Sequence, residues 1–221
     1  MHAIDLPDWA IARGSVLNRF ETIDAARTAL VVVDMQNVFL AADEVFGNPN
    51  ALAIIPQVNR LAAAMRAAGG TVIWTRQTVS HSPPLAMPAW QYDLAIPDVR
   101  RAVETMLAGT RSHALHPDMA IAPGDLVLDK YRYSAFLCPA GALRDALEEH
   151  GIDMLLIAGT LTNVCCESTA RDGNMLGYKV IVVSDATAAV TDAEQNAALL
   201  NLRLAFADVH GTDAIRAMLG G

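Results

Sequence analysis

The stretch MLLIAGTLTNVCCESTARDG, residues 154–173, predicts a buried strand followed directly by a helix. It opens with an apolar run that ends in glycine, and a run without polar alternation is typical of a strand buried on both faces of a parallel sheet. Thr162 and Asn163 are both good helix N-caps, so we expect Cys165 to lie in the first turn of the helix. A strand that leads into a helix is the repeating unit of α/β proteins.

Five further apolar runs predict strands elsewhere in the chain, at TALVVVD (28–34), GTVIWT (70–75), DLVLDK (125–130), KVIVVSD (179–185) and AFADVHG (205–211). Helical patterns lie between them, at IIPQVNRLAAAMRAAGG (54–70), CPAGALRDALEEHG (138–151) and 192–203. Pro139 suits a first helical turn, and Gly69 and Gly151 suit helix ends. This alternation predicts an α/β fold, a three-layer doubly wound (Rossmann-like) six-stranded, mainly parallel sheet with helices on both faces. We find no repeat or linker and expect a single domain over 1–221.

Residues 78–124 depart from the alternating pattern, because they hold six of the chain's 10 prolines and one plausible helix at about 98–108. A long irregular excursion inside a compact domain is usually functional. This excursion follows the carboxyl end of the second strand, where open α/β sheets bind ligands. Its aromatic and histidine side chains could serve a site or only anchor the loop; they include Trp90, Tyr92, His81, His113 and His116.

Composition limits the partners of the protein. The formal net charge of −8 argues against nucleic acid and anionic membranes, which both need a basic surface, and leaves a small-molecule substrate. Hydrophobic residues make up 53% of the chain and charged residues 18%, which indicates apolar surface buried between subunits and predicts a homo-oligomer, a dimer or tetramer. No signal-peptide pattern opens the chain and no apolar run approaches the ~18 residues of a membrane span, so we expect a cytoplasmic location.

Three polar residues stand at the carboxyl ends of three predicted strands: Asp34, Lys130 and Cys165. A charge after a buried run is unfavourable unless it is paired, so Asp34 and Lys130 could form a purely structural ion pair. In the first turn of a helix, free N–H groups and a nearby lysine lower the pKa of a thiol, and a carboxylate can take its proton. Nucleophile, base and cation together support attack on a carbonyl, whose oxyanion the same N–H groups can hold.

Three segments resemble the signature segments of the isochorismatase-like cysteine hydrolases: VVVDMQNVF (31–39), DKYRYSAF (129–136) and AGTLTNVCCESTARDG (158–173). The resemblance extends over about residues 25–210, and the spacing of Gly159, Thr162 and Cys165 fits the family pattern. Within the family, the motifs are closest to ureidoacrylate amidohydrolase-type amidases.

The resemblance implies a role for each of these residues. Cys165 is then the nucleophile, Asp34 the general base and Lys130 the cation that stabilises charge. It also implies a non-proline cis peptide at Thr160–Leu161, with the N–H groups of Leu161 and Cys165 as the oxyanion hole. The expected activity is hydrolysis of an amide, ureido or carbamoyl C–N bond of a small molecule through a thioester or thiocarbamate. We expect Cys166 to be a packing residue.

Departures from other family members narrow this expectation. The family's metal-dependent nicotinamidases carry histidines soon after the first motif, and residues 35–49 contain none, so we expect no metal and no cofactor. The alternative is a metal held by His113, His116 and Asp118. The family's isochorismatases work without the cysteine, which leaves an ether or ester hydrolase without covalent catalysis, or a silent binding homologue, as alternatives. A redox switch at the adjacent cysteines would need a strained disulfide.

The substrate pocket is harder to predict than the catalytic residues. The candidates for its wall are Trp74, Arg76, Trp90, Tyr133 and Phe136. Arg76 follows a strand and could bind a carboxylate, or it could form a surface ion pair. The charged residues Glu167, Arg171 and Asp172 could contact substrate or simply form a solvated face.

Overall fold

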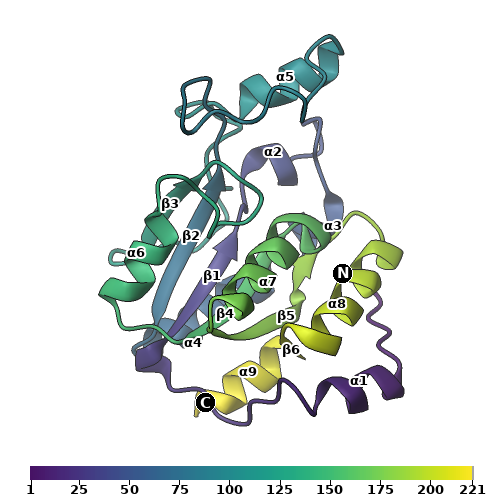
Figure 1. Cartoon of the computed structure of the whole chain (residues 1–221), viewed down its shortest axis with the longest axis vertical. Coiled ribbons are helices and arrows are strands. Elements are labelled where there is room, and N and C mark those ends of the chain that lie inside the picture. The colour runs from purple at the N-terminus through teal and green to yellow at the C-terminus, as the bar shows by residue number, and fades with distance from the viewer. Residues whose placement is uncertain (221) are drawn as a thin grey trace.

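The computed structural model of the protein describes residues 1–220, which form one six-stranded sheet flanked by helices (Figure 1). The strands are β1 (Thr28–Val33), β2 (Thr71–Gln77), β3 (Leu126–Lys130), β4 (Met154–Thr160), β5 (Lys179–Ala188) and β6 (Asp208–His210). Their order is β3-β2-β1-β4-β5-β6, and every neighbouring pair is parallel. The predicted doubly wound parallel sheet is confirmed.

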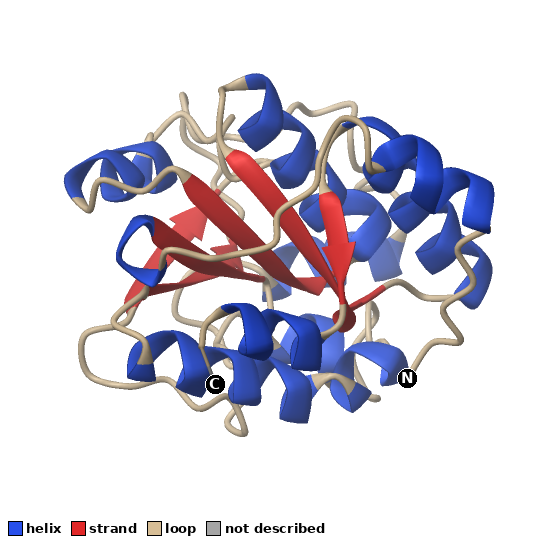
Figure 2. Cartoon of the chain, turned by 90° about the horizontal axis from the view of Figure 1, so that it is seen from below, coloured by secondary structure: helices blue, strands red, loops and turns tan. Residues whose placement is uncertain are grey.

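Helices cover both faces of the sheet, as Figure 2 shows. They are α1 (Asp8–Gly14), α2 (Asn37–Leu40), α3 (Pro49–Ala53), α4 (Ile55–Ala67), α5 (Pro97–Thr105), α6 (Ala142–Glu149), α7 (Glu167–Met175), α8 (Asp192–Ala205) and α9 (Thr212–Met218). A 3₁₀ turn, η1 (Ala25–Arg27), precedes β1, and a π-helical turn, η2 (Thr162–Cys166), precedes α7. Every residue of β1 is buried, as an unalternating apolar run predicts.

The side chains of β1 divide between two hydrophobic cores. Leu30 and Val32 pack into the core that contains α4 and α9, whereas Val31 and Val33 pack into the core that contains α6, α7 and α8. Successive side chains of a strand point to opposite faces, so this division follows from an apolar residue at every position. The central strand is therefore held from both sides, which fixes the position of the residue that follows it.

The ends of β1 and β4 lie side by side, because Val33 pairs with Gly159. Gly159 has φ of 109°, and a Cβ there would lie 2.1 Å from the carbonyl oxygen of Val33. Only glycine fits this close approach. It brings the residue after β1 next to the segment that carries the adjacent cysteines.

Some predicted boundaries are wrong. The helix predicted from Pro139 begins at Ala142, because Gly141 precedes it with φ of 69°, outside the helical region. The strand predicted over 205–211 is confined to β6, because α8 continues to Ala205. Gly69 and Gly151 follow helices with positive φ, as predicted.

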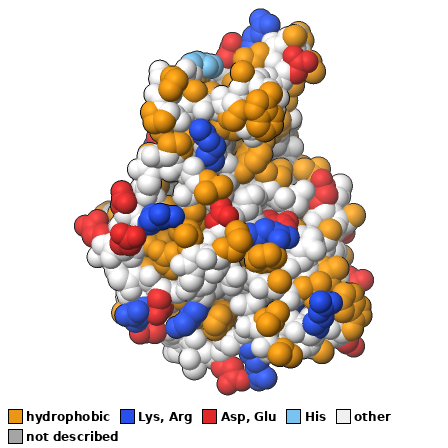
Figure 3. Space-filling model, in the orientation of Figure 1, with side chains coloured by type: hydrophobic (Ala, Val, Ile, Leu, Met, Phe, Trp, Pro, Cys, Tyr) orange, Lys and Arg blue, Asp and Glu red, His pale blue; other side chains and the backbone are white. Residues whose placement is uncertain are grey.

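The part of the excursion that contains α5 lies beyond the carboxyl ends of the strands, at the top of Figure 1, whereas residues 118–124 return past α4 to the start of β3. A small separate core ties the excursion to α2 through Val38, Val79, Val103 and Met106. In the space-filling view, the part of the excursion around α5 forms the narrow upper part of the molecule, where hydrophobic side chains gather (Figure 3). Within residues 1–220, no helix has the length and apolar character needed to span a bilayer.

Candidate active site

Asp34 lies at the carboxyl end of β1 with its side chain fully buried. Its φ of 51° turns the chain sharply there, in a region that aspartate tolerates better than most residues. Its Oδ1 accepts a hydrogen bond from the Thr75 hydroxyl at 2.8 Å. Its Oδ2 forms an ion pair with Lys130 Nζ at 2.7 Å. The carboxylate is thus fixed between a neutral donor and an ammonium.

Lys130 ends β3, and its ammonium has a polar neighbour on every side. Besides Asp34, Nζ lies 2.6 Å from Gln77 Oε1, 3.1 Å from the carbonyl oxygen of Arg132 and 3.4 Å from Cys165 Sγ. Burial alone would lower the pKa of this lysine, but the Asp34 carboxylate and the Cys165 sulfur outweigh burial and raise it. Lys130 therefore remains a cation although it is buried.

Cys165 lies in the π-helical turn η2, not in the first turn of an α-helix. The predicted capping is also wrong, because the Thr162 hydroxyl donates to Gln195 Oε1 at 2.6 Å and no side chain caps the start of the turn. Sγ still comes 3.4 Å from Lys130 Nζ, so the structure brings Asp34, Lys130 and Cys165 together as predicted.

The thiol of Cys165 does not have the lowered pKa that the sequence predicted. Burial raises its pKa, and although the Lys130 ammonium opposes this and the Asp34 carboxylate adds to it, the net result is a pKa of about 12. A helix terminus lowers the pKa of a thiol that is partly solvated, whereas the Cys165 thiol is buried and near a carboxylate. The thiol is therefore protonated at neutral pH, and the Lys130 ammonium that contacts it also contacts Asp34.

Gln77 is a site residue that the sequence analysis missed. It ends β2 directly opposite Lys130 in the strand register, and its Oε1 accepts from the ammonium. Its backbone N–H donates to Gln36 Oε1 at 2.7 Å, and Gln36 Nε2 donates back to the Gln77 carbonyl at 3.1 Å. Its own Nε2 is buried without a partner among residues 1–220. A polar residue at the end of an apolar strand, the signal used for Asp34 and Lys130, also marks Gln77.

The peptide bond between Thr160 and Leu161 is cis, as the resemblance implied. The carbonyl oxygen of Leu161 accepts from the N–H groups of Val164 and Cys166 at 3.1 and 3.2 Å. Leu161 and Cys165 both border the cavity described next. Cys166 is fully buried in the core against α7, in keeping with a packing residue.

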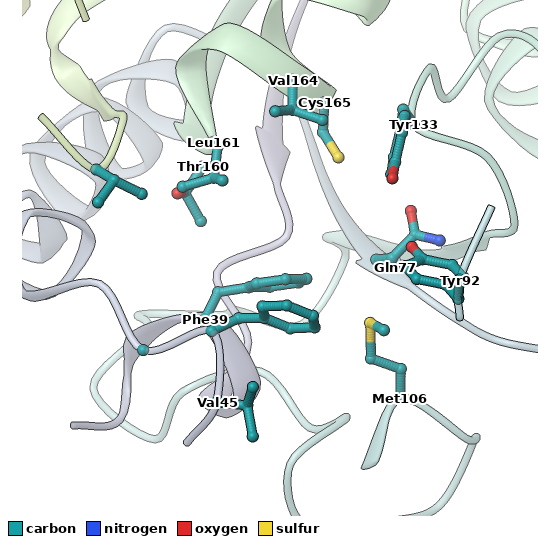
Figure 4. A pocket seen from close by; sticks show the side chains of 13 residues that line it. Phe39, Val45, Gln77, Tyr92, Met106, Tyr133, Thr160, Leu161, Val164 and Cys165 are labelled. Atoms are coloured by element: carbon teal, nitrogen blue, oxygen red, sulfur yellow. The ribbon is translucent and has the colours of Figure 1, made fainter. Parts of the chain in front are cut away.

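A cavity of about 370 Å³ opens beside Cys165 (Figure 4). Its lining is mostly apolar and aromatic and consists of Phe39, Val45, Phe46, Gly47, Gln77, Tyr92, Met106, Tyr133, Thr160, Leu161, Val164, Cys165 and Val190. In Figure 4, Phe39 and Met106 lie across the cavity from Cys165. Tyr92 and Met106 come from the excursion over 78–124, so this excursion does contribute to the cavity wall.

Of the predicted wall residues, the structure places Tyr133 at the cavity and the other four elsewhere. Trp74 is buried in the core, where its Nε1 donates to Asp125 at 2.8 Å, and Phe136 is buried against Tyr178. Arg76 pairs with Asp129 beside it on the next strand, with 2.7 Å between Nε and Oδ1. Trp90 is 85% exposed. These four predictions fail because side-chain direction within strands and loops is set by packing that the sequence pattern does not contain.

Two of the three histidines of the excursion, His113 and His116, contact other polar groups, and His81 is exposed. His113 Nε2 lies 2.7 Å from the Thr78 hydroxyl, and burial lowers its pKa. His116 Nδ1 lies 3.9 Å from Asp118. Within the described chain, no three His, Cys, Asp or Glu side chains are grouped so as to hold a metal ion.

The charged face of α7 is ion-paired. Arg171 binds Glu167 at 2.6 Å and lies over the ring of Phe206, 4.2 Å from its centroid. Neither side chain lines the cavity beside Cys165. This arrangement agrees with the structural interpretation of these charges.

The chain is similar in sequence and in structure to known proteins. The model of the isochorismatase domain family matches residues 28–214. The ureidoacrylate amidohydrolase RutB of Pseudomonas savastanoi pv. phaseolicola is 35% identical over 228 residues, covering 95% of this chain and 91% of the relative. A cysteine hydrolase from Pseudomonas syringae pv. phaseolicola superposes with a TM-score of 0.80 at 29% identity, covering 92% of this chain and 97% of the other. An isochorismatase family protein from Desulfovibrio vulgaris gives 0.76 at 26% identity, with coverages of 88% and 99%.

Proposed function

This chain belongs to the isochorismatase domain family, and from that premise we propose that it is a cysteine-dependent amidohydrolase acting on a small molecule. It hydrolyses a C–N bond other than a peptide bond, in an amide, ureido or carbamoyl group, through a covalent intermediate on Cys165. One observation carries the proposal: Lys130 Nζ lies 2.7 Å from Asp34 Oδ2 and 3.4 Å from Cys165 Sγ. A base, a cation and a thiol thus meet at the wall of a cavity.

In the first half of the reaction, Asp34 takes the thiol proton while the sulfur attacks the carbonyl carbon of the substrate. Proton transfer and attack are coupled, because a thiol with a pKa of about 12 is not ionised beforehand. The N–H groups of Leu161 and Cys165 donate to the oxyanion. Asp34 then gives its proton to the leaving nitrogen, the C–N bond breaks, and a thioester or thiocarbamate remains on Cys165 with ammonia or an amine released.

In the second half, Asp34 takes a proton from a water molecule, and the hydroxyl oxygen attacks the thioester or thiocarbamate carbon. The C–S bond breaks, the proton returns to sulfur, and the resting thiol is restored. Lys130 stays protonated throughout, since its pKa is raised. Its charge holds Asp34 in place and offsets the negative charge that develops on sulfur during attack.

The proposed reaction uses no metal ion. The carboxylate nearest the thiol is already paired with an ammonium at 2.7 Å, and that ammonium disfavours a divalent cation at the same oxygen atoms. His113 contacts Thr78 and Asp129, and His116 contacts Asp118.

A screen for ammonia release tests the proposed activity. Ureido acids, N-carbamoyl amino acids, nicotinamide and simple amides are compared, with Cys165→Ala as the matched control. We expect at least one class to release ammonia with the native protein and none with the variant. Equal release by both proteins would favour an acid–base hydrolase in which Cys165 is a bystander.

A further inference from the structure

The cavity beside Cys165 has a property that amide hydrolysis as such does not require: of the described residues that line it, none carries a charge. We propose that the substrate is a neutral, largely apolar amide or urea and not an anionic ureido acid. This inference rests on the proposed function and narrows its substrate class. The proposed substrate class also differs from the substrate in the names of the relatives, because ureidoacrylate is a carboxylate.

The walls of the cavity are suited to an apolar group. Four aromatic rings face it, from Phe39, Phe46, Tyr92 and Tyr133, and Met106 adds a flexible thioether. A volume of about 370 Å³ accommodates a single ring or a short alkyl chain. Burying such a group against these side chains supplies binding free energy without any ionic contact.

The charges of the candidate active site already balance without a substrate. Asp34 is paired with Lys130, and the Cys165 thiol is protonated because burial raises its pKa. The ammonium of Lys130 is occupied by Asp34, Gln77, the Arg132 carbonyl and the sulfur. A substrate carboxylate would therefore enter as an extra buried charge without a counter-ion, which is strongly unfavourable.

The two arginines that directly precede lining residues in the sequence, Arg76 and Arg132, are also engaged with other groups. Arg132 precedes Tyr133, but its guanidinium donates to the carbonyl oxygens of Leu85, Tyr131 and Pro84 at 3.1, 2.6 and 3.3 Å. Arg76, which the sequence suggested as a carboxylate ligand, is paired with Asp129. At the cavity mouth, Val45 directly follows two acidic residues in the sequence, Asp43 and Glu44. Neither acidic residue lines the cavity, and Glu44 accepts from the Ser112 hydroxyl, so no cation is added on this side.

The polar side chains that line the cavity are neutral: the hydroxyls of Tyr92, Tyr133 and Thr160, and the amide of Gln77, which offers a donor. Gln77 is 2% exposed, and its Oε1 must face the ammonium of Lys130, which can only donate. Its Nε2 is then left buried without a partner in the described chain, in a side chain that lines the cavity. A buried amide donor is satisfied by a neutral acceptor such as a carbonyl oxygen or a ring nitrogen.

A pair of alkylating reagents that differ only in charge tests the inference without requiring turnover. The rates at which iodoacetamide and iodoacetate modify Cys165 are measured by fragment-ion mapping and normalised to their rates with glutathione. We expect the neutral reagent to be favoured by at least about tenfold, since the anion loses its hydration in the cavity. A normalised ratio of the iodoacetamide rate to the iodoacetate rate that is near or below one overturns the inference. A Cys165 that reacts with neither reagent also overturns it.

A charge placed at the cavity mouth provides a matched variant. Val45 is 37% exposed, so Val45→Arg adds a cation where the fold has room for a long side chain. We expect Val45→Arg to raise the rate with iodoacetate relative to iodoacetamide several-fold, and Val45→Gln to leave that ratio within twofold of the native value. No change in the Val45→Arg ratio contradicts the inference.

Turnover of matched substrates separates the inference from the proposed function. Butylurea is compared with 3-ureidopropionate, and benzamide with 4-carbamoylbenzoate. We expect kcat/KM for the neutral member to exceed that for the anion at least tenfold. Faster hydrolysis of the anions would leave the amidohydrolase function intact and overturn the substrate class. If no compound is hydrolysed, the proposed function fails, and the alkylation ratio still decides the character of the cavity.

Discussion

The ammonium of Lys130 lies 3.4 Å from the sulfur of Cys165, yet the pKa of that thiol is raised to about 12. Burial and the Asp34 carboxylate outweigh the attraction of the lysine for a thiolate. The resting site therefore holds an ion pair and a neutral thiol, so the proton of Cys165 must leave during attack. Turnover in the proposed reaction therefore requires the base, Asp34, as much as the nucleophile, Cys165.

The raised thiol pKa predicts how stability depends on pH. Cys165 ionises near its ordinary value of 9.0 in the unfolded chain but near 12 in the folded one. Its contribution to the free energy of unfolding is therefore complete below pH 9 and is lost as the pH rises towards 12. We expect native protein to lose more stability than Cys165→Ala between pH 9 and 11, by up to about 1.4 kcal/mol per pH unit. Urea unfolding at each pH measures this, and parallel curves would contradict it.

Asp34→Asn removes the base and preserves the shape. The variant can still accept from Thr75, but it leaves the ammonium of Lys130 without its counter-ion. We expect a folded protein that is less stable by about 3 kcal/mol and nearly inactive. Asp129→Asn is the control, because it breaks the more exposed pair with Arg76 and should change stability by less than about 1 kcal/mol and retain activity. Substantial activity in Asp34→Asn would place the base elsewhere.

Gln77 acts in this account as a positioning residue for Lys130. Gln77→Leu removes the acceptor that lies 2.6 Å from Nζ, and a hydrogen bond to a charged group contributes about 1.5–3 kcal/mol. We expect kcat/KM to fall roughly 10- to 100-fold. Gln77→Glu keeps the acceptor and, like Gln77→Leu, loses the donor, so KM should rise in both variants while kcat falls less in Gln77→Glu. Identical steady-state constants for the two variants would show that Gln77 only supports the fold.

The two adjacent cysteines should respond differently to truncation. Cys165 faces the cavity, so Cys165→Ala should abolish turnover with little change in melting temperature. Cys166 is fully buried among apolar side chains, so Cys166→Ala should stay active and lose about 1 kcal/mol through a small cavity. Thermal unfolding and a rate assay on both variants check this, and an inactive, fully stable Cys166→Ala would reverse the assignment.

Removal of metal ions should not affect the rate. Dialysis against a chelator is expected to leave kcat unchanged, because the proposed steps use only the side chains of Asp34, Lys130 and Cys165 and backbone N–H groups. A loss of activity that zinc, iron or manganese restores would contradict this. It would also favour the alternative in which His113 and His116 bind a metal ion.

The sequence predicted the catalytic arrangement better than the pocket, for a physical reason. Asp34 and Lys130 each follow an apolar strand, and parallel strands bring their carboxyl ends to one edge, so their meeting follows from pattern alone. Phe46 and Tyr92 reach the cavity from irregular segments, where tertiary packing sets the side-chain direction. The pKa of Cys165 could not be predicted, because it depends on how deeply the thiol is buried.

The central claim is a covalent intermediate on Cys165, and intact-mass spectrometry tests it most directly. The protein is mixed with a slowly hydrolysed amide, quenched in acid during turnover, weighed and fragmented. We expect a mass increase equal to the acyl group, mapped to Cys165 and absent from Cys165→Ala. An adduct on Cys166, or turnover by Cys165→Ala, would contradict it.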